Sequence, residues 1–227
     1  MLNLFRESIL GVHHGLMHAR AAIDEAMFFN QIKRAPFRRC MPCKPYDGWK
    51  FFVLGDAVTR TVVNFFWDDG ITLNAKICKN NPCKFGGAIV QRLLADVETL
   101  TSRIALDRYF PNPALCAWIV ARGGDVTAMW DPRKGPFPVW LKLLSKKPTK
   151  KCPKGTFRSA SALDGRLWAF SFMDNAACYC LDTAEGGVFT DLMRMQKKGT
   201  KRYGEKIAVK GPKCNEYYQG TMGVIDG

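Results

Sequence analysis

A-A-I-D-E-A-M-F-F, residues Ala21–Phe29, is an apolar run interrupted by two acids. Apolar side chains on both sides of the interruption are typical of a strand buried in a sheet. A charge inside such a strand is costly unless it is paired or binds a metal ion. We therefore interpret the run as a buried strand with a functional interruption, and Asp24 as the first candidate site residue.

The segments that follow predict an α/β fold. Aromatic and β-branched residues indicate strands, whereas apolar residues at helical spacing predict an amphipathic helix at 87–100. Pro113 begins a second helix through Arg122, which Gly123 ends. The predicted strands are Ala21–Phe29, Trp49–Asp56, Val62–Trp67, Arg103–Asp107 and Asp125–Trp130. This order favours a mixed sheet flanked by helices.

The composition changes after residue 130. Residues 131–155 are rich in Pro and Lys, and short strand-like pieces follow at 155–159, 166–172 and 177–182. We interpret residues 131–213 as an inserted, β-rich unit.

The charge balance predicts a polyanionic partner. The chain has 34 Lys and Arg against 20 Asp and Glu, a formal net charge of +14, and nucleic acid is the leading candidate. A ribosomal protein, a membrane-surface protein or a merely basic surface stay open on composition alone. No apolar run approaches the roughly 18 residues of a membrane helix, and no secretion signal is evident, so we expect a soluble, non-secreted protein.

Basic residues along the chain are candidate phosphate ligands. They lie in segments 33–50, 142–154 and 194–213 and around residue 133, and such contacts position DNA rather than read its sequence. The predicted nucleic-acid-binding residues are Lys33, Arg34, Arg38, Lys44, Lys50, Arg133 and Lys134. Trp49, Trp67, Trp130 and Trp140 are either base-stacking or core residues.

The nine cysteines fit reduced thiols better than a disulfide framework. Cys40-x-x-Cys43 and Cys78-x₄-Cys83 are a possible but disfavoured zinc site. Cys178 and Cys180 are predicted core residues of a strand. The histidines His13, His14 and His18 have near-helical spacing but no evident carboxylate or cysteine partner.

A second acid stands at the end of a predicted strand. Asp107 closes R-I-A-L-D, residues Arg103–Asp107. Acids at a strand centre and at a strand end of one sheet can converge, and a divalent cation resolves their repulsion. Mg²⁺ suits this role because it takes oxygen ligands. The alternative is that each acid forms a turn or caps a helix.

The neighbourhoods of these acids resemble the piggyBac transposase family. Its I-D-E, M-P-x-K-P and G-x-K segments correspond to Ile23-Asp24-Glu25, Met41-Pro42-Cys43-Lys44-Pro45 and Gly48-Trp49-Lys50. Its second acidic segment corresponds to D-R-Y-F-P-N-P-A-L, residues 107–115, and the following one to V-T-A-M-W-D-P-R-K-G-P-F-P, residues 126–138. Its third acidic segment corresponds to Met222-Gly223-Val224-Ile225-Asp226.

The resemblance implies an RNase H-like sheet with a β-rich insertion between the second and third acids. It divides the chain into a lead-in (1–20), the first part of the catalytic core (21–130), the insertion (131–213) and a truncated return to the core (214–227). The family's N-terminal region and Cys-rich zinc-binding tail are absent, so we expect the chain to be cut short at both ends.

The resemblance also implies a function. Asp24, Asp107 and Asp226 carry over as the metal-binding catalytic acids, with Mg²⁺ or Mn²⁺ as cofactor. The expected partner is DNA, namely transposon ends and a TTAA-type target, with a possible homodimer, a nuclear location, and neither a membrane nor a small-molecule substrate. A non-catalytic, transposon-derived DNA-binding protein is the alternative, and an unrelated RNase H-like nuclease is a third hypothesis.

Overall fold

The computed structural model describes residues 19–30, 38, 40, 47–68, 81–97, 100–133, 137–195 and 206–226, except the side chains of 195 and 224–226. The strands are β1 (Arg20–Phe29), β2 (Gly48–Asp56), β3 (Thr61–Trp67), β4 (Arg103–Leu106), β5 (Asp125–Met129), β6 (Phe157–Ala162), β7 (Leu167–Met173), β8 (Ala177–Asp182), β9 (Phe189–Met195) and β10 (Lys206–Pro212). The helices are α3 (Lys84–Leu93), α4 (Pro113–Ala121), α5 (Cys214–Asp226) and the 3-10 helix η1 (Val139–Leu141). None of these helices is long and apolar enough to span a bilayer.

Eight strands form one mixed sheet in the order β3-β2-β1-β4-β5-β8-β7-β6, and β9 pairs with β10 in a second sheet. β1 is parallel to β4 and β4 to β5, whereas the other neighbouring pairs are antiparallel. The predicted α/β fold is therefore confirmed, and strands from the predicted insertion extend the sheet beyond β5. The domain boundaries themselves stay a prediction.

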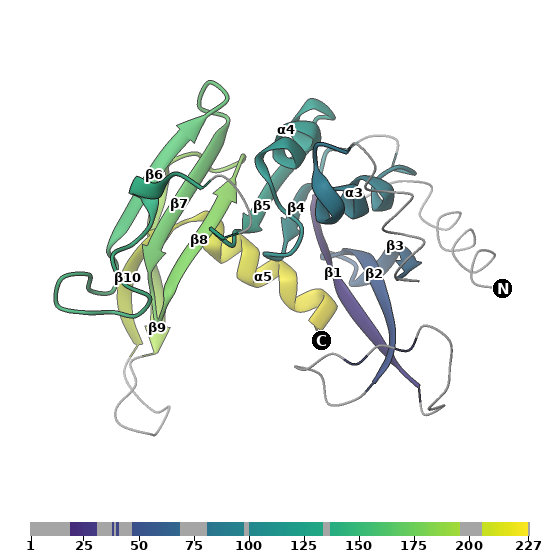
Figure 1. Cartoon of the computed structure of the whole chain (residues 1–227), viewed down its shortest axis with the longest axis horizontal. Coiled ribbons are helices and arrows are strands. Elements are labelled where there is room, and N and C mark those ends of the chain that lie inside the picture. The colour runs from purple at the N-terminus through teal and green to yellow at the C-terminus, as the bar shows by residue number, and fades with distance from the viewer. Residues whose placement is uncertain are drawn as a thin grey trace.

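The two faces of the sheet pack against different helices (Figure 1). On one face Ile23 and Leu106 belong to the main core, together with apolar residues of α3 and α4. On the other face Ala22 and Ala105 pack against Met222 of α5. This division follows from the strand geometry, because successive side chains of a strand point to opposite faces.

The observed helix ends test the start and stop residues that the sequence predicts. Pro113 is the first residue of α4, and the Asn112 side chain accepts a hydrogen bond from the Leu115 backbone N–H at 2.9 Å. Gly123 has a φ of +87°, which favours glycine, so the predicted start and stop of this helix are confirmed. The predicted helix at 87–100 instead begins at Lys84 and ends at Leu93.

The sheet formed by β9 and β10 is missing from the predicted elements. Sequence patterns indicate a basic segment at 194–213 within the predicted β-rich unit but no strand there, whereas the structure pairs Leu192 with Val209 in an antiparallel register. Leu192 packs against Phe170 and Phe172 of β7 in a second core cluster. Tertiary packing of a few apolar residues therefore decides this segment.

Gly86 of α3 allows a close approach that a larger residue blocks. A Cβ built there would lie 2.6 Å from the Tyr109 carbonyl oxygen and 2.9 Å from the Phe110 Cα, both backbone atoms. We expect Gly86→Ala to destabilise the protein by about 1–3 kcal/mol through overpacking.

Urea denaturation would measure this loss, and Gly220→Ala in α5 is the matched control. A Cβ at Gly220 meets nothing within 4 Å, so alanine there should be neutral or stabilise by up to about 1 kcal/mol through helix propensity. Equal stabilities of the two variants would contradict the close approach of α3 to the 109–110 turn.

Candidate active site

The parallel pairing of β1 with β4 brings the first two predicted acids to neighbouring positions. Ile23 pairs with Leu106 in this register. Asp24 and Asp107 are the residues that directly follow this pair, one along each segment. Neighbouring strands lie about 4.8 Å apart, and side chains at matched positions share a face. The observed register thus sets the two residues at neighbouring backbone positions, and convergence of their carboxylates on one metal ion stays a prediction.

Helix α5 lies over the same face of the sheet. Asp24 and Asp107 each follow by two residues an alanine that packs against α5, namely Ala22 and Ala105. The Tyr218 hydroxyl of α5 donates a hydrogen bond to Asp107 Oδ1 at 3.3 Å. The Glu25 backbone N–H donates to Asp24 Oδ1 at 2.8 Å. Both carboxylates are half-buried, since α5 covers part of this face.

The third predicted acid, Asp226, is the last residue of α5. It follows Met222, which packs on the sheet, by about one helical turn. Its side chain lies outside the described part of the chain, so its role as a metal ligand stays a prediction.

The described acids suit a hard divalent cation in kind and position. Mg²⁺ takes oxygen ligands and commonly uses one or two carboxylates together with water and substrate phosphates. Asp24 and Asp107 supply two such carboxylates on one face. Among the residues that the structure describes, no group of three His, Cys, Asp or Glu side chains could hold a metal ion.

Glu25 belongs to a different cluster on the opposite face. Its Oε1 lies 2.6 Å from Lys50 Nζ, which is also 3.8 Å from Asp68 Oδ2. The ammonium sits 4.8 Å from the Phe52 ring centroid and 5.3 Å from that of Tyr109. Lys50, a predicted DNA ligand, is thus held inside an ion pair whose side chains are mostly buried.

The other predicted DNA-binding residues fall into two groups. Arg38 Nη2 lies 3.1 Å from Asp47 Oδ2. Arg133 is 84% exposed and forms an ion pair with Asp131 at 2.8 Å. The remainder lie outside the described residues, namely Lys33, Arg34, Lys44 and Lys134. Contact of any of these residues with DNA stays a prediction.

The structure describes only some of the residues that the cysteine and histidine hypotheses name. Cys43 and Cys78 of the disfavoured zinc site lie outside the described residues, as do His13, His14 and His18. The core prediction is confirmed for Cys180, which is buried in the cluster around Phe170, whereas Cys178 is only partly buried against this cluster. All seven described cysteines are free thiols.

A buried charge network around Arg103 is absent from the sequence predictions. Its guanidinium, at the start of β4, donates to Asp182 Oδ1 at 2.9 Å, Glu185 Oε1 at 2.8 Å and Thr127 Oγ1 at 2.8 Å. It also stacks over the Tyr217 ring at 4.0 Å, and the Tyr217 hydroxyl donates to the Arg103 carbonyl oxygen. The network therefore joins β4, β5, the end of β8 and α5.

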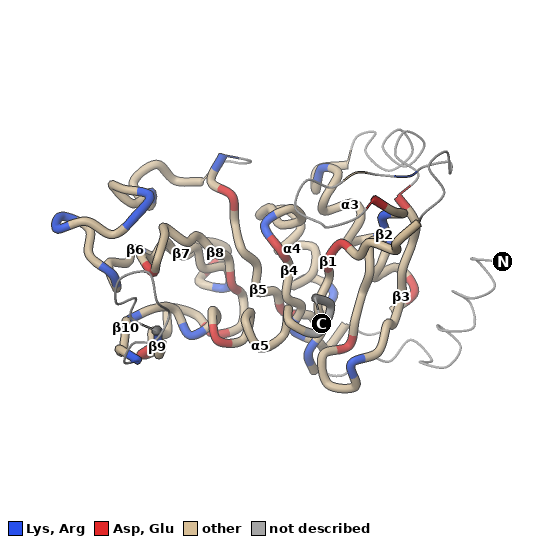
Figure 2. Tube along the Cα trace, turned by 90° about the horizontal axis from the view of Figure 1, so that it is seen from below, with Lys and Arg blue, Asp and Glu red and all other residues tan. Residues whose placement is uncertain are grey.

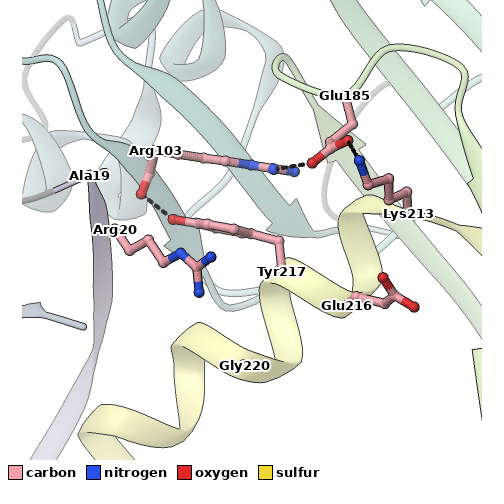
Figure 3. A pocket seen from close by; sticks show the side chains of 8 residues that line it. All are labelled: Ala19, Arg20, Arg103, Glu185, Lys213, Glu216, Tyr217 and Gly220. Atoms are coloured by element: carbon pink, nitrogen blue, oxygen red, sulfur yellow. Dashed lines mark hydrogen bonds and ion pairs between the residues drawn. The ribbon is translucent and has the colours of Figure 1, made fainter. Parts of the chain in front are cut away.

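This network borders an open pocket of about 440 Å³ (Figure 3). Its lining residues are Ala19, Arg20, Arg103, Glu185, Lys213, Glu216, Tyr217 and Gly220. The pocket lies where β1 and β4 begin, whereas Asp107 follows the last residue of β4. It is therefore separate from the paired carboxylates.

Opposing effects act on the pKa of the Glu185 carboxyl in this pocket. Burial raises the pKa of its carboxyl, but hydrogen bonds from Arg103 and Lys213 outweigh burial and leave the pKa below its ordinary value of 4.5. A lowered folded-state pKa means that Glu185 stabilises the fold above pH 4.5 and that this contribution disappears as the pH falls below it.

The mixed sheet and the helices on its two faces define an α/β core. A cryo-EM structure of piggyBac transposase, in a synaptic complex with hairpin DNA, is similar to the chain with a TM-score of 0.67 and 21% sequence identity. The match covers 93% of this chain but only 39% of that transposase chain. No family model and no curated protein sequence matches. The likeness shows that this chain has the fold of the corresponding part of piggyBac transposase.

Proposed function

We propose that the chain is the DNA-cleaving core of a piggyBac-type transposase, with Asp24, Asp107 and Asp226 as ligands of Mg²⁺ or Mn²⁺. The observation that carries the proposal is the β1–β4 register, which sets Asp24 beside Asp107 on the face that α5 covers. A basic chain of net charge +14 is suited to holding a DNA backbone near these acids.

The chemistry is phosphodiester hydrolysis followed by strand transfer. In hydrolysis a water oxygen bonds to phosphorus while the bond from phosphorus to the 3′-oxygen breaks, and that oxygen takes up a proton as a 3′-hydroxyl. In strand transfer this 3′-hydroxyl oxygen bonds to the phosphorus of a target phosphodiester, and the 3′-oxygen of the target strand leaves as a new hydroxyl. When bound, the metal ion supplies charge stabilisation and lowers the pKa of the attacking water. Asp24 and Asp107 hold the ligand oxygens in place, and the Tyr218 hydroxyl orients the Asp107 carboxylate through its hydrogen bond.

The proposed partner is DNA that carries transposon ends, with a TTAA-type target as the resemblance implies. The proposed location is the nucleus, where such DNA lies. Assembly as a homodimer completes the proposal, because cutting two transposon ends together needs two active sites.

The test is nicking of a duplex that carries the terminal repeats of the flanking element, with Mg²⁺, Mn²⁺ or EDTA present. We expect nicks with 3′-hydroxyl ends that require the metal ion. Binding of the duplex without nicking in either metal would contradict the proposal and favour the non-catalytic DNA-binding alternative.

A further inference from the structure

A long loop before β6 carries an unusual concentration of positive charge. Residues 139–154 contain six Lys and no Asp or Glu. We call residues 139–154 the basic loop. It extends at the end of the molecule where β6–β10 lie (Figure 1), and blue segments recur along it in Figure 2.

The basic loop is anchored to the sheet by alternate residues. Leu141, Leu143 and Cys152 are buried, and the last two pack against Met173 of β7. The Ser171 hydroxyl donates to the Leu141 carbonyl oxygen, and the Ala177 backbone N–H donates to the Lys146 carbonyl oxygen at 3.0 Å. These attachments hold the backbone in one conformation, so the outward side chains are displayed in a fixed pattern.

Two basic side chains stabilise the basic loop by hydrogen bonds within the protein. Arg158 Nη1 donates to the carbonyl oxygens of Trp140 and Lys142, the latter at 3.1 Å. Lys154 Nζ donates to the Asn175 side chain at 2.9 Å. Both side chains are thereby occupied within the protein, and the remaining lysines of the loop are left for an outside partner.

The outward side chains combine positive charge with exposed apolar surface. Trp140 is 60% exposed, whereas the other five tryptophans are buried or half-buried. Its neighbours Val139 and Leu144 are 79% and 76% exposed. The exposed lysines are Lys142, Lys146, Lys147, Lys150 and Lys151. The nearby acid Asp174 is paired with Arg194 at 2.9 Å, so it leaves this charge largely unopposed.

We propose that the basic loop binds single-stranded DNA, with Trp140 stacked on an unpaired base and the exposed lysines on the flanking phosphates. Base faces are covered in a duplex but accessible in a single strand, and sequence-tolerant stacking with backbone contacts is the usual means of holding one. The proposal rests on the proposed function in one respect, namely that the chain works on DNA. It adds a second contact that receives a strand unpaired near the cut.

An anionic lipid surface also attracts lysines with exposed apolar residues. Surface-bound segments of that kind usually present an amphipathic helix, whereas η1 spans only Val139–Leu141 and its Leu141 faces the protein core. The observations therefore favour a nucleic acid strand.

The test measures binding of the full chain to a fluorescent oligonucleotide of about 12 nucleotides, within the usual range of single-strand site sizes. EDTA is present throughout, so cleavage plays no part. We expect Trp140→Ala to weaken single-strand binding about tenfold or more, while Trp140→Phe retains most of it. Melting temperatures should agree among these variants, since the side chain is 60% exposed.

The lysines are tested by their salt dependence. Lys150→Gln with Lys151→Gln should flatten the slope of log affinity against log salt by about 1.4, because each single-strand phosphate contact contributes about 0.7. Arg60→Gln with Lys84→Gln is the matched control: it removes two exposed cations elsewhere, on the β2–β3 turn and on α3, and should leave the slope near that of the wild type.

Three results would overturn the inference: unchanged single-strand affinity in Trp140→Ala, an equal loss of duplex affinity, or preferential binding to vesicles of anionic phospholipid. Failure of the proposed function is a separate outcome, because it appears as absent nicking by the wild-type chain in Mg²⁺.

Discussion

Asp107→Asn should reduce metal-dependent DNA nicking by about 10³-fold or more while leaving DNA affinity in EDTA unchanged. The substitution keeps the shape of the side chain and removes the charge that would bind the metal ion, which supplies several kcal/mol of transition-state stabilisation. Asp24→Asn should act alike, because Asp24 occupies the neighbouring position of the parallel pair. Single-turnover nicking and fluorescence anisotropy measure the two quantities.

Asp164→Asn is the matched control for this change. Asp164 is exposed in the turn between β6 and β7 with a φ of +55°, a conformation that asparagine tolerates well. Its nicking rate should equal that of the wild type. Nicking by Asp107→Asn at the rate of this control would remove Asp107 from the proposed site.

Thermal unfolding provides a readout that does not depend on activity. Two neighbouring carboxylates repel each other without a cation, so Asp107→Asn should melt no lower than the wild type in EDTA. Mg²⁺ or Mn²⁺ should raise the melting temperature of the wild type, because a ligand that binds only the folded state stabilises it. That increase should disappear in the variant. A lower melting temperature in EDTA would indicate a structural role instead.

The neighbouring positions of Asp24 and Asp107 could be predicted because each acid interrupts or ends a strand whose local pattern is strong. Neighbouring parallel strands then bring them together without further information. Asp226 carries no comparable local signal. Its proposed role depends on how α5 crosses the sheet, which contacts such as the Tyr218–Asp107 hydrogen bond show but a helical pattern cannot.

The sequence patterns do not predict the ion pairs between residues that lie far apart in the chain. Lys50 is the last residue of the basic segment 33–50, which favours a phosphate contact, yet the β1–β2 pairing places it against Glu25. Arg103 and Asp182 are 79 residues apart. Their pairing depends on β8 joining the sheet beside β5, and no spacing rule predicts that insertion into the strand order.

Arg103→Leu is expected to lower the free energy of unfolding by about 3–5 kcal/mol, because it leaves an uncompensated buried charge. The partner Asp182 is fully buried and the Arg103 side chain is 12% exposed. For a chain of this size the melting temperature should fall by about 6–20 °C. Urea denaturation at neutral pH would measure the loss.

Arg38→Leu is the control, since it breaks an ion pair whose carboxylate, Asp47, is 38% exposed and should cost about 0–1 kcal/mol. Addition of Asp182→Asn to Arg103→Leu separates charge from packing. The asparagine oxygen can still accept from Thr127, which lies 2.6 Å from Asp182 Oδ1, so the double variant should regain part of the stability. If it melts below the single variant, the stranded charge is not the cause. Lost contacts of the guanidinium with the Tyr217 ring would then explain the destabilisation.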